Sequence, residues 1–314
     1  MDLIKELKDY NLIAVSGHIS PDGDAIGSCI AMTLYLRKVW PDKDIRLFLD
    51  DIPECFKEIE GSEIIDNTFS GMDPEAYILI DAMPDRMGSG QKLYNAAKLR
   101  INIDHHISNN EGCGDLNFLD ANASSSAELV FRLMDLSFLD KKIASWIYLG
   151  IVHDTGVFKY PATSPETMRV CARLMEEGIE CQHLIDTTYY EKTFSQNLAC
   201  ARIVLSSKLL FDGKVIIGKI TRQEMTEHNI EKSDFEGVIN QLRITKGVEV
   251  AVFMYPMNDT TVKVSLRSKE NINVAEICES FGGGGHIRAS GFYHKGTMEE
   301  IEQRIIDILS EKEF

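Results

Sequence analysis

The sequence has no hydrophobic run long enough to cross a membrane. A transmembrane helix needs about 18 or more consecutive apolar residues, and no run in the 314 residues approaches that length. The first residues, Met1–Glu6, also lack the basic-then-apolar order of a signal peptide. We therefore expect a cytoplasmic protein that has no membrane partner.

Cysteine is scarce and shows no pairing pattern. The seven cysteines form no Cys-x-x-Cys pair, and their number is odd. A disulfide framework or a cysteine zinc site would normally show such a pattern. Several cysteines, such as Cys29, lie among the apolar residues of an expected helix. We therefore expect buried free thiols.

Positive charge is also in short supply. The chain has 33 Lys and Arg residues against 49 Asp and Glu residues, which gives a net charge of −16. This balance argues against a broad electropositive surface that follows a long polynucleotide. Metal ions and a focused basic cluster would still allow an anion to bind locally. Short phosphorylated substrates therefore fit better than long duplex nucleic acid.

The N-terminal part alternates short apolar strands with helical segments. We expect strands at residues 12–16, 45–49, 77–80 and 99–103. We expect helices at residues 24–40, 125–134, 141–154 and 165–177. Strands separated by helices pair in parallel through crossover connections, which predicts a doubly wound parallel α/β sheet. In such sheets, ligands bind beyond the carboxyl ends of the strands.

The C-terminal part has a different pattern. We expect strands at residues 214–220, 248–255 and 261–266, and helices at residues 273–280 and 297–310. This order predicts a smaller α+β domain. We therefore expect a larger domain at 1–188, a linker at 189–195 and the smaller domain at 196–314.

Four clusters of carboxylate and imidazole groups lie at the ends of the N-terminal segments. They are His18-x-x-x-Asp22-x-Asp24, Asp81, Asp104-His105-His106 and Gly150-x-x-x-Asp154-Thr-Gly156. These groups suit Mn²⁺ or a similar divalent cation. Taken singly, Asp22 and Asp24 could cap a helix and Asp81 could begin a loop. Asp154 ends a helix, where the helix dipole opposes a negative charge unless a cation compensates. Four such clusters together favour a metal site.

A glycine run near the C-terminus, Gly282–Gly285, precedes His286 and Arg288. Such a run could be a flexible linker, but the adjacent basic residues favour a backbone nest that binds an anion. Upstream, Arg267 can offer a forked pair of donors to a phosphate group. Surface ion pairing is the simpler interpretation for the neighbouring Lys263 and Lys269.

These motifs resemble those of a known family. The four N-terminal clusters are similar, in order and spacing, to the motifs of the DHH phosphoesterase superfamily. The segment Gly282-Gly-Gly-Gly-His286-x-x-Ala289-Ser290-Gly291 resembles the signature of the associated DHHA1 domain, and Ser265-Leu-Arg267-Ser268 lies upstream of it. The whole chain resembles the small bacterial nanoRNases that also dephosphorylate 3'-phosphoadenosine 5'-phosphate (pAp). The resemblance implies a DHH catalytic domain at 1–188 and a DHHA1 substrate-binding domain at 196–314.

The resemblance also implies residue roles. It implies two divalent cations per chain, Mn²⁺ being expected and Mg²⁺ the alternative, which share a hydroxide that attacks the phosphoryl group. One cation would be held by His18, Asp22 and Asp81, and the other by Asp24, Asp81, His105 and Asp154. The implied catalytic residues are Asp81, Asp104, His105 and His106, where Asp104 holds the neighbouring imidazole and His106 lies near the phosphate. The implied substrate-binding residues are Arg267, Ser268, Gly283, Gly284, Gly285, His286 and Arg288.

The implied function is hydrolysis of short oligonucleotides, linear dinucleotides such as pApA, or pAp to mononucleotides. One alternative is an inorganic pyrophosphatase or polyphosphatase, although such relatives carry a different second domain. Another is a non-catalytic RNA- or nucleotide-binding module, which would predict the loss of metal ligands. A homodimer is a further expectation at the level of the family.

Overall fold

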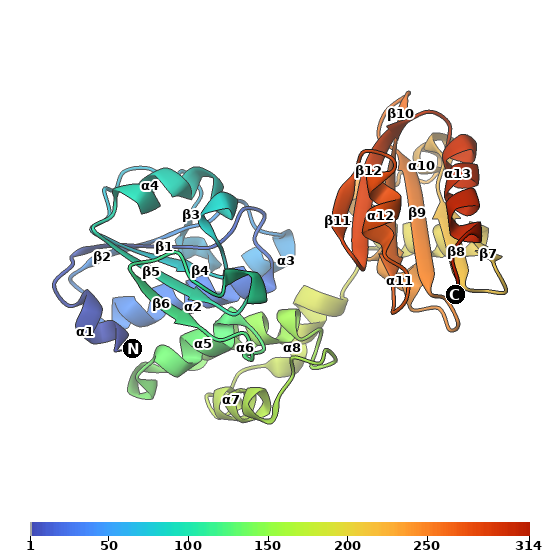
Figure 1. The fold of residues 1–314 in the computed structure, drawn as a ribbon. Helices are drawn as coiled ribbons and strands as arrows, with labels where there is room; N and C mark the ends of the chain where they lie inside the picture. Colours follow the sequence, from blue (N-terminus) through green and yellow to red (C-terminus); the bar gives the residue numbers. More distant parts are fainter. Residues whose placement is uncertain (1) are drawn as a thin grey trace. The chain divides into compact units, whose positions relative to one another are not determined.

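The structure is a computed structural model that describes residues 2–314. It divides into two compact units, the first ending at Glu191 and the second comprising Lys192–Phe314. Each unit is built around one sheet (Figure 1). Among the described residues, no helix combines the length and the apolar character needed to span a bilayer.

A six-stranded parallel sheet forms the centre of the first unit. Its strands are β1 (Leu12–Ser16), β2 (Asp44–Phe48), β3 (Ile65–Asp66), β4 (Ala76–Ile80), β5 (Leu99–Asp104) and β6 (Leu116–Leu119). Their order in space is β3-β2-β1-β4-β5-β6, and every neighbouring pair is parallel. The order reverses between β1 and β4, so the expected doubly wound sheet is confirmed.

Helices cover both faces of this sheet (Figure 1). The helices of this unit are α1 (Leu3–Leu7), α2 (Gly23–Val39), α3 (Glu54–Lys57), α4 (Gln91–Ala96), α5 (Ser126–Leu133), α6 (Lys141–Asp154), α7 (Pro165–Met175) and α8 (Cys181–Ile185), of which α7 and α8 pack against α6. The main core lies between the sheet and a layer that includes α2, α5 and α6. A smaller core, which includes Tyr77 and Tyr94, lies under α4 on the other face.

Helices α2 and α6 approach each other closely at Gly27 and Gly150. A Cβ atom at Gly27 would lie 2.4 Å from the carbonyl oxygen of Trp146 and 2.8 Å from the backbone nitrogen of Gly150. A Cβ atom at Gly150 would lie 3.0 Å from a carboxylate oxygen of Asp24. The absence of side chains at these two positions therefore brings the helix that carries Asp24 against the helix that ends at Asp154.

The second unit contains a six-stranded sheet of mixed direction. Its strands are β7 (Lys208–Leu210), β8 (Val215–Lys219), β9 (Val250–Pro256), β10 (Thr261–Ser268), β11 (Gly284–His286) and β12 (Ala289–Lys295). Their order is β11-β12-β10-β9-β8-β7, and only the β8–β9 pair is parallel. The helices are α9 (Phe194–Ser206), α10 (Arg222–Glu227), α11 (Val238–Arg243), α12 (Val274–Glu279) and α13 (Met298–Ser310).

Two separate cores cover the two faces of this second sheet. Residues of α12 and α13 pack on one face, against the inward side chains of β9, β10 and β12. Residues of α9 and α11 pack on the other face, over β8 and β9.

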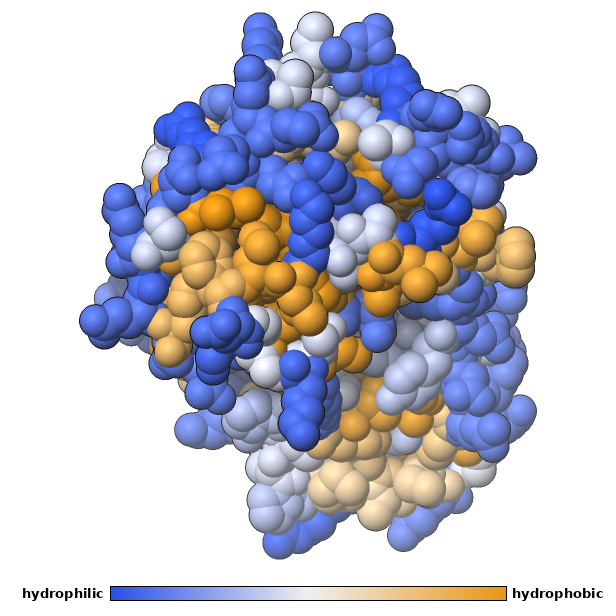
Figure 2. Space-filling view, turned by 90° about the vertical axis from the view of Figure 1, so that its right-hand side faces the viewer, coloured by the Kyte–Doolittle hydropathy of each residue, from blue (hydrophilic) through white to orange (hydrophobic). Residues whose placement is uncertain are grey.

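Figure 2 shows apolar areas between hydrophilic residues on the face that it draws, and Val204, Leu205 and Leu209 are exposed on α9 and β7. The homodimer remains a prediction.

Several elements differ from the sequence-based expectation. Strands β3, β6 and β12 and helix α9 were not expected. Helix α9 begins at Phe194, inside the range expected to be a linker, and Thr193 caps it by accepting a hydrogen bond from the N–H of Gln196. The functional domain boundaries therefore remain a prediction.

Candidate active site

The four predicted clusters converge at the carboxyl edge of the first sheet. His18 follows β1, Asp81 directly follows β4, and Asp104 ends β5. Strands β1 and β4 are the neighbours between which the strand order reverses, and a crevice at this position is where doubly wound sheets bind ligands. Parallel pairing thus brings together residues that are far apart in the sequence.

One group of side chains consists of His18, Asp22 and Asp81. The Nε2 atom of His18 lies 3.7 Å from Oδ1 of Asp22 and 3.7 Å from Oδ2 of Asp81. Asp22 also caps α2, because its Oδ1 atom accepts hydrogen bonds from the N–H groups of Asp24 and Ala25. Asp22 can therefore cap α2 and also belong to the group of possible metal ligands.

A second group consists of Asp24, His105 and Asp154. The Nε2 atom of His105 lies 3.8 Å from Oδ2 of Asp24, 3.7 Å from Oδ1 of Asp81 and 3.4 Å from Oδ2 of Asp154. Asp81 therefore lies between the two groups, with Oδ2 toward His18 and Oδ1 toward His105. This is the arrangement that a bridging carboxylate requires.

Both histidines are oriented by backbone carbonyl groups. The Nδ1 atom of His18 lies 2.8 Å from the carbonyl oxygen of Ile19, and Nδ1 of His105 lies 3.4 Å from that of Ala123. A carbonyl oxygen can only accept, so Nδ1 carries the proton in each neutral imidazole and the Nε2 lone pair faces the carboxylates. The two Nε2 lone pairs thus point toward the same carboxylates, an arrangement that fits a divalent cation.

Burial makes the ionised form of these carboxylates unfavourable when no cation is bound. Asp24 and Asp81 are 1% and 2% exposed. Burial raises the pKa of Asp24, and the charges of Asp154 and Asp22 raise it further. Burial also raises the pKa of Asp81, as do the charges of Asp24 and Asp22. Burial also raises the pKa of Asp154. Bound cations would offset this repulsion.

Asp22 shows the opposite shift. Burial alone would raise its pKa, but the neighbouring His18 side chain and the hydrogen bond from the backbone N–H of Ala25 lower it to about 2. Asp22 is therefore ionised at neutral pH and offers a permanent negative charge at the entrance to the cluster.

The backbone of Asp81 has a left-handed conformation, with φ of 59°. This conformation costs a non-glycine residue on the order of 1–3 kcal/mol. It is held by a hydrogen bond from the Asp81 N–H to the carbonyl of Ile103 (2.9 Å) and by the Ser126 hydroxyl, which donates to Oδ1 of Asp81 (2.9 Å). Strain of this kind persists where the surrounding structure fixes a functional side chain.

Ser126 is a site residue that the sequence analysis missed. Besides its bond to Asp81, its backbone N–H donates to Asp24 (2.6 Å), and the N–H of Ala127 donates to the other Asp24 oxygen (2.9 Å). The first turn of α5 therefore fixes both central carboxylates. The Ser124–Ser126 run indicated only the start of a helix, because its neighbours in space could not be read from the sequence.

Asp104 holds the imidazole of His106 rather than that of His105. Its Oδ1 atom lies 2.8 Å from Nδ1 of His106, and its Oδ2 atom accepts a hydrogen bond from Asn109 (2.6 Å). The hydrogen bond with Asp104 raises the pKa of His106. The half-exposed His106 is thus suited to donate a proton or a hydrogen bond.

A small cavity lies beside this pair. Its lining includes Asp81, Asp104, His106, Ser108 and Arg86. Arg86 is the only basic side chain besides His106 among these lining residues, and the sequence analysis did not single it out. A phosphate group in this cavity would meet Arg86 and His106 as donors.

The predicted substrate-binding residues of the second unit divide between the two faces of its sheet. The register places Arg267 opposite Ala289, and Ala289 opposite His286, so the side chains of these three residues share a face. The next row of that face contains Ser265, Gly291 and Gly284. Small residues therefore form an open floor between Arg267 and His286.

Three parts of the substrate-binding prediction do not fit the structure. Ser268 is 1% exposed and belongs to the buried face of β10. Arg288 donates to the carbonyl groups of Ile272 and Glu270. The first half of the glycine run is not free to form a nest, because the N–H groups of Gly282 and Gly283 donate to backbone carbonyls, while Gly284 and Gly285 belong to the edge strand β11.

The comparisons with known proteins agree with this geometry. Residues 12–151 match the DHH family, N-terminal domain, and residues 212–312 match the DHHA1 domain. The chain belongs to the DHH/DHHA1 family. The comparisons support a phosphoesterase of this family, a hydrolytic enzyme that acts on phosphodiester or phosphate bonds.

Similar proteins cover nearly the whole chain. A bifunctional oligoribonuclease and PAP phosphatase, NrnA, from Thermus thermophilus is 28% identical over 96% of this chain and 90% of its own length. The protein of the same name from Bacillus subtilis is 29% identical over 92% of this chain and 91% of its own. The crystal structure of an exopolyphosphatase-related protein from Bacteroides fragilis has a TM-score of 0.85 and 26% identity, covering 97% of this chain and 94% of that one.

We expect Mn²⁺ to stabilise the DHH domain. A ligand at 100 times its Kd stabilises the folded state by about 2.7 kcal/mol, which corresponds to a rise in Tm of roughly 5–10 °C for a domain of this size. Differential scanning calorimetry with and without Mn²⁺ measures the rise.

The matched variants are Asp154→Asn and Asp73→Asn. Asp154 belongs to the second group, whereas Asp73 is exposed and lies in a loop before β4. Asp154→Asn should reduce the Mn²⁺-dependent rise in Tm to less than about half, and Asp73→Asn should leave it unchanged. An unchanged rise in Asp154→Asn would remove Asp154 from the metal centre.

Proposed function

We propose that this protein is a cytoplasmic phosphohydrolase that uses two divalent cations, with Mn²⁺ as the preferred metal, to cleave short oligonucleotides, linear dinucleotides such as pApA, and pAp. The observation that carries the proposal is Asp81, whose two carboxylate oxygens face the two separate groups of ligands. The length and names of the similar proteins support the choice of substrates.

The proposed ligands are those of the two groups. His18, Asp22 and Asp81 would hold one cation, and Asp24, Asp81, His105 and Asp154 the other. Cations held there would supply positive charge to the phosphoryl oxygens and lower the pKa of a bound water molecule.

The residues of the chain supply orientation and protons. The carbonyl groups of Ile19 and Ala123 keep Nδ1 of the two ligand histidines protonated, so that each Nε2 atom is available. His106, positioned by Asp104, would donate a hydrogen bond or a proton to the phosphate or to the departing oxygen. Arg86 would bind a further phosphoryl oxygen from the adjacent cavity.

The DHHA1 domain would bind the phosphate end of the substrate. Arg267 and His286 flank the open floor of small residues on one face of its sheet. Tyr293 is exposed on the same face, and the Lys263 ammonium group lies 4.0 Å from its ring centroid. An exposed ring next to a cation is suited to contact a nucleobase.

A substrate panel tests this function. Purified protein with Mn²⁺ should hydrolyse pAp, pApA and a five-nucleotide RNA at least about tenfold faster than a twenty-four-nucleotide RNA or pyrophosphate. The products are separated and quantified by chromatography. Short substrates should be favoured because the net charge of −16 argues against a broad basic surface that follows a long polynucleotide.

The panel also separates the alternatives. A preference for pyrophosphate would mean that the substrate assigned to the DHHA1 domain is wrong. Tight binding of RNA without turnover of any substrate would instead favour the non-catalytic module.

A further inference from the structure

Two arginines of the DHHA1 domain lie near enough for their charges to interact, and no ion pair to either is formed by residues 2–314. Arg243 ends α11, and Arg267 lies near the end of β10. Helix α11 packs against β9 and β10, and the Lys269 ammonium group donates to the carbonyl of Thr245 (3.1 Å), which joins the segment after α11 to the segment after β10. The two guanidinium groups are therefore held on one part of the domain.

Neither arginine has an acidic partner among the described residues 2–314. Arg267 donates from Nη1 to the carbonyl of Leu266 (3.0 Å), and neither residue forms an ion pair. The Nε atom of Arg243 is buried and has no hydrogen-bond partner. A buried donor without an acceptor is costly, so its occurrence beside a second unpaired arginine calls for an acceptor from outside the chain.

The arrangement is electrostatically unfavourable in the free protein. Burial lowers the pKa of Arg267, and the charge of Arg243 lowers it further. The chain has 49 acidic residues against 33 basic ones, so a carboxylate partner would have been readily available to a purely structural arginine pair. An anion bound between the two groups would remove the repulsion.

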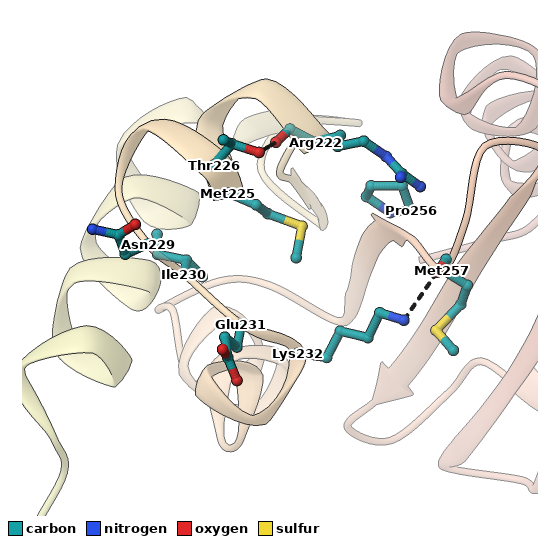
Figure 3. A pocket seen from close by; sticks show the side chains of 9 residues that line it. All are labelled: Arg222, Met225, Thr226, Asn229, Ile230, Glu231, Lys232, Pro256 and Met257. Carbon is teal, nitrogen blue, oxygen red and sulfur yellow. Dashed lines mark hydrogen bonds between the residues drawn. The ribbon is translucent and has the colours of Figure 1, made fainter.

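A second arginine environment in this domain offers a contrast. Figure 3 shows a cavity lined by residues that include Arg222 and Lys232. Arg222 forms an ion pair with Asp259 (2.9 Å), and Lys232 donates to the carbonyl of Met257 (2.9 Å). The Arg222 charge is therefore balanced by a carboxylate, which is the partner that Arg243 and Arg267 do not have among the described residues.

Small residues lie beside Arg267 on its face of the sheet. On the same face, Ala289 and Gly291 of β12 lie between β10 and the exposed strand β11. His286 of β11 is the cross-strand neighbour of Ala289. A planar guanidinium group binds two phosphate oxygens at once. Two such groups can enclose a terminal phosphate, which carries more charge and more free oxygens than an internal phosphodiester.

We propose that Arg243 acts with Arg267 to bind the terminal phosphate of a nucleotide, so that Arg243 determines specificity for substrates that carry such a phosphate. The proposal rests on the proposed function for the identity of the substrate. Its test uses binding without metal, and it is therefore independent of catalysis.

The experiment compares the binding of adenosine 5'-monophosphate and of adenosine by isothermal titration calorimetry, in buffer that contains EDTA and no phosphate. The full-length proteins are the wild type, Arg243→Gln, Arg243→Lys and the control Arg222→Gln. We expect Arg243→Gln to weaken binding of the monophosphate by roughly tenfold or more, Arg243→Lys to retain part of the affinity, and Arg222→Gln to match the wild type. Binding of adenosine should be the same in all four.

Thermal unfolding distinguishes a binding role from a structural one. Removing one of two like charges should leave the Tm of Arg243→Gln equal to or above that of the wild type in the absence of nucleotide. If Arg243 had a purely structural role, the Tm of Arg243→Gln would be lower than that of the wild type. Arg243→Lys would then have the same Tm as Arg243→Gln only if the charge did not contribute to stability.

Three outcomes would overturn the proposal. They are equal affinity of Arg243→Gln and the wild type for the monophosphate, an equal loss of affinity for adenosine, and a wild type that binds adenosine as tightly as the monophosphate. Hydrolysis of pApA with Mn²⁺ is measured separately on the same proteins. An inactive wild type would contradict the proposed function while leaving the result on phosphate binding intact.

Discussion

Replacing Asp81 with asparagine is expected to reduce hydrolysis of pApA by a factor of about 10³ or more. Asp81 lies between the two groups of ligands, with one oxygen facing each. Asparagine keeps the size of the side chain but has one oxygen and no charge, so it cannot bridge two cations. Asparagine is also one of the residues that best tolerates a left-handed backbone, which Asp81 adopts with φ of 59°.

The activity loss can be separated from unfolding. Burial and the charges of Asp24 and Asp22 raise the pKa of Asp81, which means that the ionised carboxylate is unfavourable in the metal-free fold. Asp81→Asn should therefore have a Tm without metal that is equal to or above that of the wild type. A variant that is stable and inactive would identify a functional carboxylate.

Asp85→Asn is the matched control for this experiment. Asp85 is exposed and lies in the same loop, four residues after Asp81. It should retain wild-type activity within about twofold, because it lies outside the groups of possible ligands. Turnover of pApA by Asp81→Asn at a rate near that of Asp85→Asn would refute the two-metal assignment.

The convergence of the candidate metal ligands could be predicted because it follows from strand topology. Asp81 and Asp104 come at the ends of apolar segments, and the ends of parallel strands meet at one edge of a sheet. The supporting residues could not be predicted in this way. Ser126 donates to Asp81 and Arg86 lines the adjacent cavity, and only the folded chain brings these residues together.

The structure buries Ser268, which was predicted to bind substrate, and the sequence contains the signal for this burial. Successive residues of a strand point to opposite faces. Val262, Val264 and Leu266 are buried on β10, and Ser268 continues their series, whereas Arg267 belongs to the other face. The family motif Ser265-Leu-Arg267-Ser268 therefore spans both faces of the sheet, and alternation would have assigned only Ser265 and Arg267 to the open one.

The missed strands have few of the residues that mark a strand in sequence. Strand β12 contains Ala289, Ser290 and Gly291 in its first three positions, and β6 is short and half-buried. Their pairing depends on neighbouring strands rather than on their own composition. Because β12 was not expected, the glycine run next to it was interpreted as a nest instead of an edge strand.

A change far from the catalytic atoms should also have a large effect. Gly27→Ala is expected to destabilise the DHH domain by about 3 kcal/mol and to lower its Tm by roughly 6–12 °C. The added Cβ atom would lie 2.4 Å from the carbonyl oxygen of Trp146 and 2.8 Å from the nitrogen of Gly150. Both are backbone atoms of α6, so they cannot move aside as a flexible side chain would, and α2 and α6 must separate.

Separation of these helices should disturb the metal centre as well. Helix α2 carries Asp24 and α6 ends at Asp154, and both carboxylates lie within 3.8 Å of Nε2 of His105. We therefore expect Gly27→Ala to lose roughly tenfold in activity at a temperature where it is still folded. Gly284→Ala is the control for stability, because its added Cβ atom would meet no atom within 4 Å. If Gly27→Ala were as stable as Gly284→Ala, close contact between the two helix backbones would not be what positions Asp24 against Asp154.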